Sequence, residues 1–147
     1  MISGLKLSSD FDDLVLKYYS VLLSLSLGLK FIINHLNAFS DSYEIDTILV
    51  SGGLSSNPLY LQELSNITGA KVFASSDKAM LVGSAIVAAV AGGLYSDLLV
   101  AMKSMGSSGI IYFPTTNNEV IAYYKKKYEI YLLMYEHQKV YKQILQE

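Results

Sequence analysis

The sequence contains no cysteine, which excludes disulfide bonds and thiolate metal sites and fits a cytoplasmic protein. Charged residues are also scarce: they make up 16% of the chain, with a formal net charge of −2. The chain therefore lacks the positive excess that attracts nucleic acid or anionic membranes, and we expect neither as a partner. Hydrophobic residues make up 52% of the 147 residues, enough for a folded core, which excludes a disordered chain.

Long uninterrupted hydrophobic runs are also missing. Residues 14–29 are broken by Lys17, two tyrosines and several serines, and residues 79–94 are rich in glycine, alanine and serine. Both fall short of the roughly 18–20 apolar residues that a membrane-spanning helix needs. Residues 8–13 are polar and acidic, unlike the hydrophobic part of a signal peptide. We expect both runs to form buried helices.

The first two-thirds of the chain alternates between helix and strand patterns. Polar residues 8–10 precede an apolar helix that reaches about Phe39, and residues 45–50 and 71–74 are short buried strands. Asn57 is a favourable N-cap, with Pro58 at the first helical position and Gly69 at the end of the helix between the strands. A further helix, capped by one of residues 75–77, runs to Gly92–Gly93. This βαβα order predicts an α/β fold with parallel strands.

Helical spacing predicts which apolar side chains are buried. The first helix has one such stripe: Leu14, Tyr18, Leu22, Leu25, Leu29, Ile32 and Leu36. After a short helix at 97–105, a loop at 106–109 and a small strand at 110–113, a long helix runs from Asn117 or Asn118 toward Ile144. Its stripe is Ile121, Tyr124, Tyr128, Tyr131, Tyr135 and Gln138. Tyrosine with lysines 125–127 would also suit stacking on nucleic acid, but the helical spacing favours a packed face with a solvated lysine edge.

Gly52–Gly53 is the most informative feature for function. The pair follows the first strand and precedes a helix, so the free N–H groups and dipole of that helix point toward the turn. Such a turn favours a phosphate or another polar ligand at the carboxyl end of a strand. Two glycines can equally serve turn geometry alone, and spacing does not separate these two interpretations.

Other catalytic patterns are absent. The sequence has no GxxxxGK[ST] loop, no GxGxxG opening a helix and no GxSxG elbow. His35 and His137 each stand alone on a helix, without a second ligand at metal spacing. We identify no catalytic residue and no metal ligand in this chain.

Several segments, in order, resemble the C-terminal domain of the FGGY carbohydrate kinases, most closely the ribulose-kinase group. They are Val50-Ser-Gly-Gly-Leu-Ser-Ser-Asn-Pro-Leu-Tyr-Leu-Gln62, Ile67-Thr-Gly-Ala-Lys-Val72, Met80-Leu-Val-Gly-Ser-Ala-Ile-Val-Ala-Ala89, Tyr123-Tyr-Lys-Lys-Lys-Tyr-Glu129, Glu136-His-Gln-Lys139 and the lead-in Gly4-Leu-Lys-Leu-Ser8. The resemblance covers nearly the whole chain. Lys78 departs from it, because many members carry an acidic residue there.

The resemblance implies the C-terminal half of an actin-like ATPase (ribonuclease H-like) fold. Residues 1–113 would form the nucleotide-binding core and residues 114–147 a helical extension that packs on it. In such kinases the Gly-Gly turn lies against ATP or ADP and the following asparagine faces the adenine, roles that would fall on Gly52, Gly53 and Asn57. The helix at Gly83–Ala85 would pack behind the nucleotide. Mg²⁺ is expected to accompany ATP, with no ligand from this chain.

The sugar in this family is held mainly by an N-terminal domain, which also carries an Asp-x-Gly-Thr phosphate segment and the catalytic aspartate. None of these is found in the 147 residues. Because phosphoryl transfer needs magnesium and both walls of the cleft, we expect this chain alone not to phosphorylate sugars. The alternatives are part of a pentulose kinase, a non-catalytic nucleotide-binding or interaction module derived from one, and an α/β domain without a ligand.

Overall fold

The computed structural model describes residues 10–39, 44–75, 79–106 and 109–146. A three-stranded sheet has the order β1 (Thr47–Val50), β2 (Lys71–Ala74) and β3 (Ile110–Tyr112). β1 and β2 run parallel and β3 is antiparallel to β2, so the predicted parallel pair is confirmed. The chain has the mixed α/β fold of an actin-like C-terminal domain. The caps expected at Ser76 or Asp77, and the unusual Lys78, lie outside the described residues.

One face of the sheet is covered and the other is open. Ile48 and Val50 of β1 join Val72 and Ala74 of β2 on the covered face, against α1 (Phe11–Ala38) and α2 (Pro58–Thr68). On the opposite face Leu49, Phe73 and Ile111 lie side by side in register, and Leu49 is 78% exposed. An apolar row of this kind is typical of a sheet face that a further layer covers.

α2 is the most deeply buried element. Leu61, Leu64 and Ile67 are at most 1% exposed. Leu61 and Leu64 pack with the sheet and Leu22 of α1, whereas Ile67 belongs to a second cluster with α1 and α5 (Asn118–Ile144). The sequence determines both ends of α2, since Asn57 caps the start and Gly69, at φ 80°, ends it in the left-handed conformation.

The predicted stripe of α1 is largely wrong. Of its seven residues only Leu22 is buried, and Leu14, Tyr18, Leu25, Ile32 and Leu36 are each 47–61% exposed. The buried residues are Leu22, Leu23, Ser26, Leu27 and Ile33. α1 is apolar on several sides, so spacing alone did not select the side that meets α2 and α5. The predicted start of this helix is confirmed, because Asp10 is its N-cap.

Tyr124 is the buried residue of α5, the helix that packs on α1 and α2. Tyr124 is 5% exposed, and its hydroxyl donates to Glu63 of α2 and lies 3.2 Å from the hydroxyl of Tyr19 of α1. Burial, and then the hydrogen bond to Glu63, raise the pKa of Tyr124, so it stays a neutral donor. Tyr128 and Tyr131 pack beside it, but Ile121 and Tyr135 of the predicted stripe are 45% and 40% exposed. The domain boundary at residue 113 stays a prediction.

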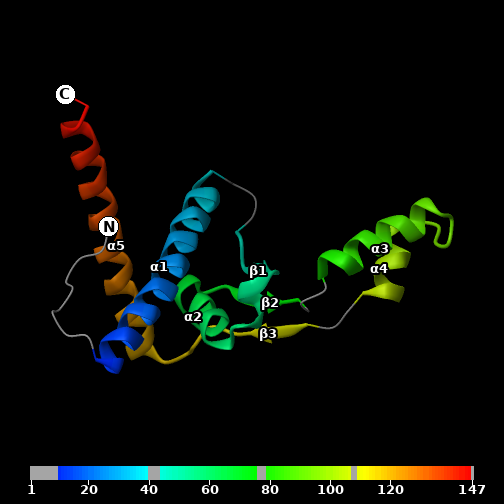
Figure 1. Cartoon of the computed structure of the whole chain (residues 1–147), viewed down its shortest axis with the longest axis horizontal. Helices are drawn as coiled ribbons and strands as arrows, with labels where there is room; N and C mark the ends of the chain where they lie inside the picture. Colours follow the sequence, from blue (N-terminus) through cyan, green and yellow to red (C-terminus); the bar gives the residue numbers. More distant parts are fainter. Residues whose placement is uncertain (1–9, 40–43, 76–78, 107–108, 147) are drawn as a thin grey trace.

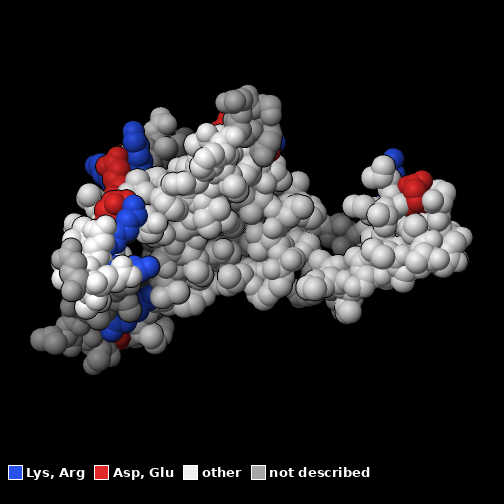
Figure 2. Space-filling model, turned by 90° about the horizontal axis from the view of Figure 1, so that it is seen from above, with Lys and Arg blue, Asp and Glu red and all other residues white. Residues whose placement is uncertain are grey.

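α3 (Ala79–Ala91) and α4 (Leu98–Met105) form a hairpin between β2 and β3 that extends beyond the end of the sheet (Figure 1). The expectation of a buried α3 is wrong: only Ile86 and Ala89 are buried, and Met80 and Leu81 are 80% and 70% exposed. Its surface carries few charges, in contrast to α5, where Lys and Glu gather (Figure 2). Composition predicted an apolar helix but not the surface that it contacts, which here is α4.

α1 is long and apolar enough to cross a membrane when only length and composition are considered. Its Leu23 and Leu27 pack with Ile67 and Tyr124, and Leu22 packs with the sheet cluster. These contacts hold one side of α1 against the domain, while 28% of its apolar 18-residue window is buried. The absence of a membrane partner stays a prediction.

Burial of α2 predicts a sharp difference between two leucines of the same helix. Leu64→Ala is expected to lower the free energy of unfolding by about 2–5 kcal/mol, because it opens a cavity in the core. Leu59→Ala is the matched control: Leu59 is 45% exposed and its loss should cost about 0.5 kcal/mol or less. Urea unfolding followed by circular dichroism measures both. Equal losses would contradict the placement of α2 at the centre of the core.

Candidate functional site

The Gly52–Gly53 turn lies where both parallel strands end. Val50 of β1 pairs with Ala74 of β2, and the backbone N–H and hydroxyl of Ser75 both donate to Val50 O, at 3.1 and 3.2 Å. The residues after each strand are therefore held side by side. This carboxyl edge of parallel strands is the usual ligand position in α/β sheets.

The two glycines differ in what the fold demands of them. Gly52 has φ 89° and ψ −163°, a conformation that essentially only glycine adopts, and its carbonyl accepts from the backbone N–H and the hydroxyl of Ser55 at 3.0 and 2.7 Å. Gly53 opens the short 3₁₀ helix η1 (Gly53–Ser56) and does not have a positive φ. A Cβ on Gly53 would meet no heavy atom within 4 Å. Among the described residues, neither conformation nor space requires glycine at position 53.

Asn57 has the capping role that its position predicts. Its Oδ1 accepts from Tyr60 N at 3.1 Å, and its Nδ2 donates to the hydroxyl of Tyr18 at 2.8 Å. The side chain is half-buried at the mouth of the turn, and one N–H of its amide is not engaged by these two bonds. Its predicted place against the adenine stays a prediction.

Sequence reasoning missed two parts of this site. Tyr18 was assigned to a buried stripe, yet it is 52% exposed and reaches Asn57 from α1. Ser75 was considered only as a helix cap, and it instead closes the edge between β1 and β2. α3 packs against α4, and the expected place of Gly83–Ala85 behind the nucleotide stays a prediction.

Within the described residues no three or more His, Asp or Glu side chains gather as a metal would require. His35 lies against Phe31 on α1, with ring centroids 4.4 Å apart. His137 lies near Tyr141, and both are on α5. The described side chains thus offer no carboxylate cluster that fits Mg²⁺. The described residues of the turn can present exposed backbone and a helix N-terminus to a polar ligand.

Comparison with known proteins agrees with the motifs. The sequence model of the FGGY family of carbohydrate kinases, C-terminal domain, matches residues 1–92. A human protein, "FGGY carbohydrate kinase domain-containing protein", is 39% identical over 148 residues, covering 100% of this chain and 26% of that protein. Its counterpart from Xenopus laevis is 38% identical over 146 residues, with 99% and 26% covered.

A more distant relative is named for its substrate. "Ribulokinase" from Mycolicibacterium smegmatis is 30% identical over 107 residues, covering 71% of this chain and 19% of that protein. This chain spans about a quarter of the length of the human and Xenopus laevis relatives, which match nearly all of it. The family expectation is confirmed: the chain belongs to the FGGY family of carbohydrate kinases, to whose C-terminal domain residues 1–92 correspond.

Proposed function

We propose that this chain is the nucleotide-binding part of an ATP-dependent carbohydrate kinase that phosphorylates a pentulose, D-ribulose being the substrate favoured by the subgroup resemblance. The observation that carries the proposal is Gly53. Among the described residues, glycine there is required neither by φ nor by a neighbouring atom, so the missing side chain suits the close approach of a ligand to the backbone. The N-terminus of α2 faces the same turn and favours the polar groups of ATP or ADP.

The sugar, Mg²⁺ and the catalytic base belong to other parts of such a kinase. Phosphoryl transfer needs in-line positioning between two walls. Support for such a division comes from the surfaces that the described residues leave open: the row Leu49, Phe73 and Ile111 and the outer side of α1 around Leu25 and Ile32. The remainder of a kinase would cover these apolar faces. A cytoplasmic location belongs to the same proposal.

A non-catalytic module remains the second candidate. The same open apolar faces would suit a partner subunit as well as the remainder of one enzyme. Both candidates place a nucleotide at Gly53, and they differ in whether a sugar is phosphorylated once the second wall is present.

Nucleotide binding tests the glycine turn. Wild type is expected to bind ADP weakly, because half of the cleft is supplied from elsewhere. Gly53→Val should lower this affinity by about tenfold or more, since a side chain there blocks backbone contact. Isothermal titration calorimetry measures both proteins.

Ala122→Val is the control. Ala122 is exposed on α5, so the substitution adds a branched side chain away from the turn. It should leave ADP affinity unchanged. If wild type and Gly53→Val bind alike, or neither binds, the glycine turn is not a nucleotide site.

Asn57 offers a test that separates stability from binding. Asn57→Ala loses the helix cap and should lower the free energy of unfolding by about 1 kcal/mol. Asn57→Asp keeps the acceptor for Tyr60 N and adds a charge that the helix N-terminus favours, so its stability should match wild type. It also removes the amide donor, and ADP should bind about two- to tenfold more weakly. If Asn57→Asp is stable and its ADP affinity is unchanged, Asn57 caps α2 and does not contact the nucleotide.

A further inference from the structure

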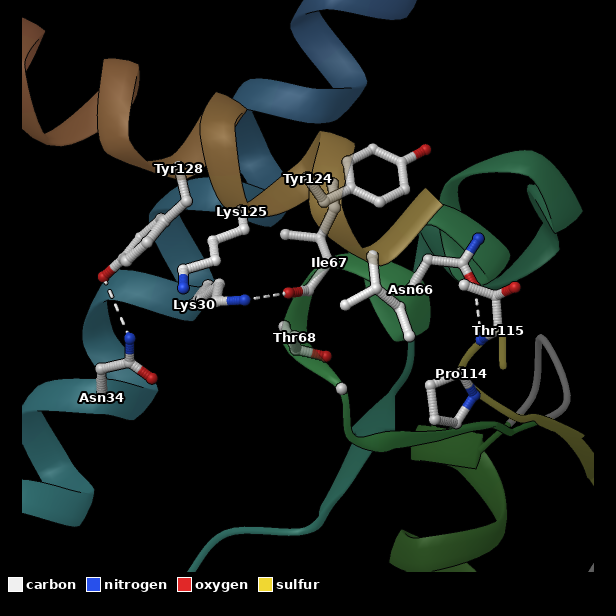
Figure 3. A pocket seen from close by; sticks show the side chains of 12 residues that line it. Lys30, Asn34, Asn66, Ile67, Thr68, Pro114, Thr115, Tyr124, Lys125 and Tyr128 are labelled. Atoms are coloured by element: carbon white, nitrogen blue, oxygen red, sulfur yellow. Dashed lines mark hydrogen bonds between the residues drawn. The ribbon is translucent and has the colours of Figure 1, made fainter. Parts of the chain in front are cut away.

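A hollow lies at the opposite end of α2 from the glycine turn. It has a volume of about 540 Å³ and is bounded by the end of α2 at Ile67–Gly69, by α1, by α5 and by the segment after β3 (Figure 3). α2 has 11 residues, so its two ends are roughly 16 Å apart. The hollow is therefore separate from the proposed nucleotide site.

Two lysines from different helices project into this hollow. Lys30 comes from α1 and Lys125 from α5, and both ammonium groups point into the same space (Figure 3). None of the twelve residues that line it is acidic. A phosphate between two ammonium groups would accept charge-assisted hydrogen bonds from both.

Lys30 is held in position rather than free in solvent. Its Nζ donates to Ile67 O at 2.5 Å and lies 5.3 Å from the centre of the Tyr128 ring. Burial lowers the pKa of Lys30, because its charged form loses water. An ammonium group has three donors, and the carbonyl of Ile67 takes one of them. The others remain for a ligand.

The rest of the wall combines fixed polar groups with apolar surface. The amide of Asn34 donates to the hydroxyl of Tyr128 at 3.1 Å, and Asn66 Oδ1 accepts from Thr115 N at 3.0 Å on the far side. Ile67 and Pro114 supply apolar contact between them. Such a wall suits a ligand with an anionic group and a small organic body.

We propose that this hollow binds a phosphate group between Lys30 and Lys125, carried by a small phosphorylated molecule whose body lies against Ile67 and Pro114. The site is independent of the proposed nucleotide turn. Free inorganic phosphate carries the same group, so the experiment compares the two sources.

Calorimetric titration of the whole chain with inorganic phosphate and with phenyl phosphate tests the site. Both should bind saturably, and phenyl phosphate should bind more tightly because its ring contacts the apolar wall. Equal affinities would assign the site to free phosphate. Lys125→Gln should weaken both by about three- to tenfold, the range expected for one charge contact from an exposed lysine.

Lys126→Gln is the matched control, because Lys126 is the next residue of α5 and does not line the hollow. It should bind both probes as wild type does. Lys30→Gln should also weaken binding. Lys30→Gln also removes the hydrogen bond to Ile67 O. If this variant does not fold, the comparison of Lys125→Gln with Lys126→Gln tests the site. Absence of saturable binding, or equal losses in Lys125→Gln and Lys126→Gln, would overturn the proposal.

Discussion

The packing of α2 is the interaction on which the rest of this structure depends. Leu61 and Leu64 are buried against the sheet and α1, while Ile67 is buried against α1 and α5. One helix thus joins both hydrophobic clusters. Because its ends are set by Asn57 and Gly69, burying α2 also places the glycine turn at one end and the two-lysine hollow at the other. Both proposed sites follow from the position of one buried helix.

Local chemistry made much of this fold predictable. Asp10, Asn57, Asp97 and Asn117 each cap the helix that follows them, because short polar side chains compete well for free backbone N–H groups. The order of strands and helices, and the parallel pair, followed from the same signals. The buried sides of α1 and α3 were not predictable. Both helices are apolar around most of their circumference, and the surface that each buries is chosen by partners distant in sequence.

The proposed sites were also predictable only in part. Gly52 and Gly53 were visible because they are adjacent and directly follow a strand. Tyr18 and Ser75 were not recognised, since each reaches the turn from another element through a contact that spacing does not encode. The hollow could not be predicted either: nothing in the sequence pairs Lys30 with Lys125, and the packing of α5 on α1 and α2 brings them together.

The most direct test of the account is a nuclear magnetic resonance titration of the ¹⁵N-labelled chain with ADP. The account predicts saturable shifts at the backbone amides of Gly52, Gly53 and Leu54 and at the side-chain amide of Asn57, the groups at the mouth of the turn. Unchanged resonances at these positions while other residues shift to saturation would contradict the placement of the nucleotide.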